Sequence, residues 1–174
     1  MAGIGLTQHF IPHLEKQSTE YKNFLKLYNI TTVLEAIKPT DESFIDTSTS
    51  ASETLFTFDT EGNLLKAEFR AFSFVLASID SFSYDKAGKL KSIVSYTVEG
   101  HASEGANITT VREFIYSEKT GVLTKVLHKE IENGKTVNFG SYDYEYDKTG
   151  KLHLIVDNTE IVFMGEIMPK CNYI

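Results

Sequence analysis

A degenerate repeat is the feature of this sequence that most limits its fold. Four segments share one pattern: two aromatic residues separated by a single position, a turn that contains glycine, then leucine and a later apolar residue. The glycines of these turns are Gly62, Gly88, Gly121 and Gly150. Their spacing corresponds to one hairpin plus its return connection. The pattern therefore predicts a series of β-hairpins.

The residues of the repeat suit a hairpin physically. Alternate aromatics place large rings on one face of a strand. Asp59, Asp85 and Asp147 each begin one of the turns, where the carboxylate can accept hydrogen bonds from backbone amides ahead of it. The glycine supplies the positive φ that closes a type I turn with a G1 bulge. A separate dipeptide, Asn133-Gly134, predicts a two-residue type I′ hairpin loop.

The same alternation predicts about nine strands. Their expected ranges are 54–59, 63–72, 79–85, 89–99, 106–117, 122–131, 135–147, 151–157 and 160–165. The connection at 72–78 is too apolar for a loop and receives no assignment. We expect a mainly β (α+β) fold, an antiparallel hairpin meander. A flat open sheet of this length would leave an apolar face in water, so a curved sheet, a barrel or a sandwich is expected.

The N-terminal part has a helical period instead. An amphipathic helix is expected over residues 19–28, with Ser18 as its N-cap. Its apolar face comprises Tyr21, Phe24, Leu25 and Tyr28. Thr32 and Glu35 form a capping-box pattern, which predicts a second short helix that ends at Pro39.

These patterns divide the chain into three segments. We expect a helical segment at 1–39 that packs on the sheet, and an acidic connector rich in serine and threonine at 40–52. A β domain with four degenerate hairpin repeats follows at 53–174. All three are expected to form one folding unit.

The repeat resembles the YD-repeat, the tyrosine-aspartate hairpin of large bacterial polymorphic toxins and of many small bacterial proteins. FSYDKAGKLKSI and YEYDKTGKLHLI fit it best, and FTFDTEGNLLKA fits reasonably. FIYSEKTGVLTKV departs from it by Ser117 and an insertion. The resemblance covers most of residues 54–157, and it implies a sheet of successive hairpins without catalytic residues. Shell-forming members carry many more repeats, so this chain is not expected to form an encapsulating shell.

The charge of the chain limits the class of partner. Its 17 basic and 24 acidic residues give a formal net charge of −7. This charge disfavours a nucleic-acid partner because phosphates repel an acidic surface. The sequence has no apolar run long enough for a membrane span and no secretory signal pattern, so we expect no membrane partner and a cytoplasmic location.

Two groups of carboxylates are candidate partner-binding residues. In residues 142–147 the period of two places three tyrosines on one face of a strand and three acids on the other. If the tyrosines pack inward, the acids form an exposed acidic stripe, whose simpler explanation is a solvated strand that resists aggregation. The candidates are Asp143, Glu145 and Asp147 in this acidic stripe, and Asp41, Glu42, Asp46 and Glu53 in or beside the connector.

Patterns for catalysis or metal binding are weak. His9 and His13 have i, i+4 spacing, but Pro12 weakens a helix there and no nearby carboxylate or cysteine completes a ligand set. Cys171 lacks the flanking residues of a known nucleophile motif. We expect no catalytic residue, no metal and no cofactor.

Three functions remain after these exclusions. The first is a protein-binding module that binds a basic protein partner. Its most concrete form is an acidic immunity protein that neutralises a cognate bacterial toxin by direct binding. The alternative is a carrier of a small apolar ligand, whose β-barrel cavity would be lined by some of the 12 Phe and 9 Tyr. An enzyme on the same scaffold is the third, and no motif favours it.

Overall fold

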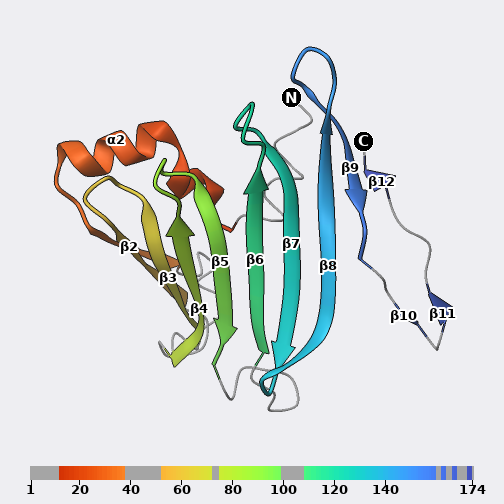
Figure 1. Cartoon of the computed structure of the whole chain (residues 1–174). Helices are drawn as coiled ribbons and strands as arrows, with labels where there is room; N and C mark the ends of the chain where they lie inside the picture. Colours follow the sequence, from red (N-terminus) through yellow and green to blue (C-terminus); the bar gives the residue numbers. More distant parts are fainter. Residues whose placement is uncertain are drawn as a thin grey trace, which may run out of the picture. The chain divides into compact units, whose positions relative to one another are not determined.

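The computed structural model describes residues 12–37, 52–71, 75–98, 108–159, 162–163, 166–167 and 172–173 (Figure 1). The helical elements are the 3-10 helix η1 (Leu14–Gln17) and the α-helix α2 (Thr19–Leu27). The strands are β1 (Thr32–Ile37), β2 (Ser52–Phe58), β3 (Leu64–Ala71), β4 (Val75–Tyr84), β5 (Leu90–Thr97), β6 (Ile108–Tyr116), β7 (Leu123–Glu132), β8 (Lys135–Tyr146), β9 (Leu152–Asp157), β10 (Val162–Phe163), β11 (Glu166–Ile167) and β12 (Asn172–Tyr173).

The fold is mainly β and follows the predicted antiparallel meander. Strands β1 to β9 are neighbours in chain order, and β12 pairs with β9. Strands β10 and β11 form a separate antiparallel pair. Among the described residues β1 and β12 end the strand order and do not pair with each other, so this sheet is not closed into a barrel.

The chain forms two compact units. The first contains residues 1–82 and 95–105, and the second contains 83–94 and 106–174. Helix α2 and strands β1 to β3 therefore belong to the first compact unit, and β6 to β9 belong to the second. The expectation that all segments form one folding unit stays a prediction.

The turns of the repeats have the predicted geometry. The four repeat glycines have φ between 71° and 81°. In the first turn, Oδ1 of Asp59 accepts hydrogen bonds from the amides of Glu61 at 2.9 Å and Asn63 at 2.8 Å. Asp85 and Asp147 accept the equivalent pairs of amide hydrogen bonds in their own turns. These three turns are thus closed by an aspartate as well as by a glycine, and in the third repeat the Ser117 hydroxyl accepts a hydrogen bond from the amide of Thr120 at 3.2 Å instead.

The Asn133-Gly134 loop between β7 and β8 is also confirmed. Asn133 has φ 48° and Gly134 has φ 77°. Two successive positive φ angles are what a type I′ loop requires, and they match the twist of the strands it joins.

Burial follows the repeat. The first aromatic and the late apolar residue of each repeat are buried, and they face each other across the hairpin where the register is described. The buried residues are Phe56, Phe82, Phe114 and Tyr144 with Ala67, Ile93, Val126 and Ile155. Of the second aromatics, Phe58 is buried, whereas Tyr84, Tyr116 and Tyr146 are half-buried.

The second aromatic of a repeat also links neighbouring hairpins in the second compact unit. The hydroxyl of Tyr116 donates to the carbonyl of Leu90 at 2.9 Å. The hydroxyl of Tyr146 donates to the carbonyl of Leu123 at 2.8 Å. Each acceptor is the leucine of the preceding repeat, so these tyrosines bind one hairpin to the next.

Helix α2 begins at the predicted residue and ends one residue before the predicted end. The Ser18 hydroxyl accepts a hydrogen bond from the amide of Tyr21 at 3.2 Å, as an N-cap does. At the other end Asn29 has φ 53°, and the amide of Ile30 donates to the carbonyl of Leu25 at 2.9 Å. This is a Schellman motif, which terminates the helix.

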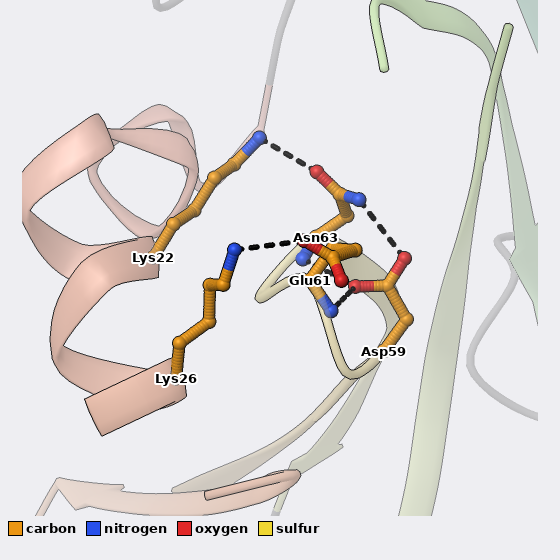
Figure 2. Close-up of polar contacts among 5 residues, drawn as sticks. All are labelled: Lys22, Lys26, Asp59, Glu61 and Asn63. Carbon is orange, nitrogen blue, oxygen red and sulfur yellow. Dashed lines mark hydrogen bonds and ion pairs between the residues drawn. The ribbon is translucent and has the colours of Figure 1, made fainter. Parts of the chain in front are cut away.

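Helix α2 is held on the turn between β2 and β3 (Figure 2). The ammonium of Lys22 donates to Oδ1 of Asn63 at 2.8 Å, and Lys26 pairs with Glu61 at 2.7 Å. Burial lowers the pKa of Lys22, although the charge of Asp59 acts in the opposite direction. These contacts fix which side of the helix faces the sheet.

Only part of the predicted apolar face of α2 is therefore buried. Leu25 is 1% exposed, and the ring of Tyr21 packs against Phe58 with 5.9 Å between centroids. Phe24 and Tyr28 are 50% and 63% exposed, contrary to the expectation from helical spacing. The helical spacing correctly predicted that α2 is a helix with apolar residues along one side. The contacts with the β2–β3 turn determine which part of that side faces the sheet.

The second helix predicted after Thr32 is wrong, because Thr32–Ile37 forms strand β1 and pairs with β2. Glu35 binds the buried Lys16 of η1 instead of capping a helix. Burial opposes the charge of Lys16, but the hydrogen bond to Glu35 and nearby charges outweigh it and raise the Lys16 pKa. Pairing along β2 thus outweighs the local capping pattern.

The unassigned connection at 72–78 is partly a strand. Strand β4 begins at Val75, and residues 72–74 lie outside the described residues. Of the strand expected at 160–165, the structure describes β10 at Val162–Phe163.

We predict that Gly62→Ala destabilises the protein more than Gly88→Ala. Both glycines have nearly the same φ, 76° and 77°, so both variants incur the left-handed strain of about 1–2 kcal/mol. A Cβ at Gly62 would also lie 2.9 Å from the backbone oxygen of Lys22, whereas nothing lies within 4 Å at Gly88. That overlap should add about 1–3 kcal/mol in urea denaturation. Equal losses would show that α2 does not rest on this turn.

Candidate functional site

The acidic stripe lies on β8 as the alternation predicts. Tyr144 is 7% exposed and points into the covered side of the strand. Asp143 is partly exposed, and Glu145 and Asp147 are exposed. The three carboxylates alternate with the tyrosines and therefore belong to the opposite face.

Two of these carboxylates have partners inside the second compact unit. Asp143 pairs with Lys125 at 3.0 Å and accepts a hydrogen bond from Nδ2 of Asn158 at 2.6 Å. Asp147 closes its own turn, and hydrogen bonds from Thr149 and Lys151 lower the pKa of Asp147. The carboxylate of Glu145 has no hydrogen bond or ion pair with any described residue, so it is the carboxylate of the stripe that is most available to a partner.

The second group of predicted carboxylates is mostly outside the described residues. Asp41, Glu42 and Asp46 lie there. Glu53 lies on β2 in the first compact unit, and its half-buried carboxylate pairs with Arg70 of β3 at 3.5 Å. The acidic stripe belongs to the second compact unit.

Exposed apolar side chains share the face of the acidic stripe, and the sequence analysis did not identify them. We call the face of β6–β8 opposite to buried Phe114 and Val126 the outer face. Register places Ile115 beside Lys125 and Lys125 beside Asp143 on this face. Ile115 is 42% exposed, and Phe139, two pairs further along β8, is 57% exposed.

A shallow depression lies on the outer face. Its volume is about 120 Å³, and it is lined by Val111, Glu113, Leu127, Lys129 and Phe139. Apolar groups therefore form much of its wall, with one carboxylate and one ammonium beside them. A depression of this size suits one apolar side chain, because sites for whole small molecules occupy about 300–1,000 Å³.

Two of the described histidines, His13 and His128, lie near carboxylates. His13 lies 3.7 Å from Asp80 and packs edge-on against Phe56 at 5.0 Å between ring centroids. His128 lies 3.4 Å from Glu130, which also accepts a hydrogen bond from Asn138 at 3.3 Å. His9 and Cys171 are outside the described residues.

The described part of the chain contains no group of three or more His, Cys, Asp or Glu side chains placed to hold a metal ion. In that same part, no helix combines the length and apolar character that crossing a membrane requires.

We predict that Tyr144→Phe is neutral or stabilising at pH 7, by up to about 1 kcal/mol, because the buried Tyr144 hydroxyl has no hydrogen-bond partner among the described residues. The matched variant Tyr146→Phe loses the bond to Leu123 and should cost about 0.5–1.5 kcal/mol. Thermal and urea denaturation compare them. A clear loss with Tyr144→Phe would mean that its hydroxyl is bonded.

Alkaline pH gives a second readout for Tyr144. Burial, with the nearby Tyr146 and Tyr142, raises the Tyr144 pKa from 10.0 to about 12. The folded state thus holds this proton more tightly, and the resulting stability is complete below pH 10 and is lost as pH rises through 12. Wild type should therefore lose stability more steeply than Tyr144→Phe over this range, and parallel curves would contradict the assignment.

No known protein-family model matches this chain, and a search of curated proteins finds no similar sequence. The resemblance to the YD-repeat therefore depends on the hairpin residues alone.

Proposed function

We propose that this chain is a protein-binding module that docks a partner protein on the outer face of β6–β8. The observation that carries the proposal is the exposed Phe139 beside an apolar depression, on the same face as the acidic stripe. Exposed apolar groups with a charged rim are typical of protein interaction sites. A large aromatic ring that the fold leaves exposed to water can supply contact area at the centre of a protein–protein interface. The bound partner excludes water from that centre.

The charges further along β8 on the outer face suggest the chemistry of the partner. Glu145 is exposed, while the carboxylate of Asp143 is already balanced by Lys125. A partner with an apolar side chain for the depression and a basic group opposite Glu145 would match both features. The second compact unit, which carries the outer face, contains 11 acidic and 11 basic residues, so the attraction of a basic partner to this face would depend on Glu145 itself rather than on the net charge of the chain.

The most concrete form of this module is an immunity protein that neutralises a bacterial toxin by covering its active surface. The hairpin repeats that resemble YD-repeats and the acidic charge both support this form. The module acts by binding and needs no cofactor, and the toxin is a basic protein that it meets in the cytoplasm. The depression of about 120 Å³ gives little support to the alternative, a carrier of small apolar ligands.

We predict that Phe139→Asp weakens partner binding at least about tenfold, as expected for a central aromatic contact. The tagged chain is used to capture proteins from its source cells, and the captured protein is identified by mass spectrometry and purified. Surface plasmon resonance then measures its affinity. Phe24→Asp is the matched control, because Phe24 is 50% exposed but lies in the first compact unit.

Glu145→Lys tests the charge separately. It should slow association at low salt and have little effect at high salt, because ions screen the long-range attraction. Glu118→Lys, a reversal at an exposed turn residue, is its control. Unchanged binding by both Phe139→Asp and Glu145→Lys would exclude the outer face as the docking site.

A further inference from the structure

Among the described residues, no strand pairs with the outer edge of β1, and the backbone groups on this edge have a defined order. The amide of Phe58 donates to the carbonyl of Thr31 at 2.9 Å, and Thr32 lies opposite Thr57. Hydrogen-bonded and non-hydrogen-bonded pairs alternate along an antiparallel ladder. The backbone groups of Val33 and Glu35 therefore point toward β2. Those of Thr32, Leu34 and Ala36 point away from it.

Within its described range, Thr32–Ile37, strand β1 carries none of the usual features that protect an outermost strand. Lysine, proline and bulges commonly block such edges. Strand β1 has neither lysine nor proline, and its register with β2 runs unbroken from Thr32 to Ile37. Its single charged side chain, Glu35, is neutralised by Lys16 of the same chain. The side chain of Leu34, at the centre of the edge, is 57% exposed.

We propose that two copies of this chain pair through β1, antiparallel about a two-fold axis at Leu34. Leu34 then faces Leu34 of the second copy, and Thr32 faces Ala36. These are the residues whose backbone groups point outward, so each of these pairs is a hydrogen-bonded pair. The two-fold axis makes the contact self-complementary, as closed dimers require.

Backbone geometry favours this register over its neighbour. An axis at Glu35 would align Val33 and Glu35, whose backbone groups already bind β2 and cannot pair with a second copy. With the axis at Leu34, each Glu35 faces Val33, and the two leucines pack together on one face. The edge therefore fits a second copy of itself without any rearrangement of β2.

The mass of the full chain in solution tests the proposal. Sedimentation equilibrium over about 10–200 µM should approach twice the chain mass of 19.6 kDa, because a dimer forms by mass action. Leu34→Lys should return the mass to that of one chain. Ala36→Pro should do the same, because it removes an N–H that points outward and leaves the bonds to β2 intact. Phe139→Lys is the matched control, since Phe139 and Leu34 are both 57% exposed.

Hydrogen exchange gives an independent readout. The amides of Thr32, Leu34 and Ala36 should exchange more slowly as the protein concentration rises, whereas the amide of Glu35, which already faces β2, should not change. A wild type with the mass of a single chain throughout overturns the proposal. So does a dimer that survives both β1 variants, or one that is lost with Phe139→Lys.

A different strand partner is distinguishable. If wild type stays single and the three amides slow only when the captured protein is added, the edge binds that protein and the dimer is excluded. The test is separate from that of the outer face, because Leu34→Lys should leave partner binding unchanged and Phe139→Lys should leave the dimer unchanged.

Discussion

In three of the hairpins, two backbone amides donate hydrogen bonds to one aspartate carboxylate near a glycine with positive φ, and these turns hold much of the described sheet in register. Each such turn fixes the register of the strands that it joins, and the ladders of β2–β3 and β8–β9 shift by one residue just before it. A slip of one residue would move every buried ring to the other face. The turn at Asp59 has a second role, because α2 rests on its glycine and its neighbouring side chains.

Much of the fold follows from local sequence because its determinants are local. Period-two alternation and turn residues such as Asn133-Gly134 act within a few residues, and the predicted hairpins are found where they were expected. Strand β1 and the exposed half of α2 depend on distant contacts instead. Glu35 binds Lys16, and Lys22 binds Asn63, so neither outcome can be inferred from the neighbouring sequence alone.

The candidate site divides in the same way. Alternation correctly places Asp143, Glu145 and Asp147 on one face, but it does not show that Lys125 and Asn158 bind Asp143. The alternation pattern does not reveal the apolar part of the outer face, because β6 and β8 carry large apolar residues on both of their faces. Val111 and Phe139 stand out of phase with the repeat, and this departure is the sequence feature by which the depression can be recognised.

The tyrosine hydroxyls that reach back to the leucine of the preceding hairpin give the array a direction. Every added hairpin would carry its own tyrosine hydroxyl as donor, and the leucine carbonyl of the preceding hairpin would be its acceptor. A gene duplication could therefore lengthen the array at its C-terminal side without a new type of contact. The first repeat carries Phe58, which has no hydroxyl and packs against α2. In evolutionary terms, the N-terminal helix fixes the first hairpin of the array. The C-terminal side of the array is where the gain and loss of hairpins are tolerated.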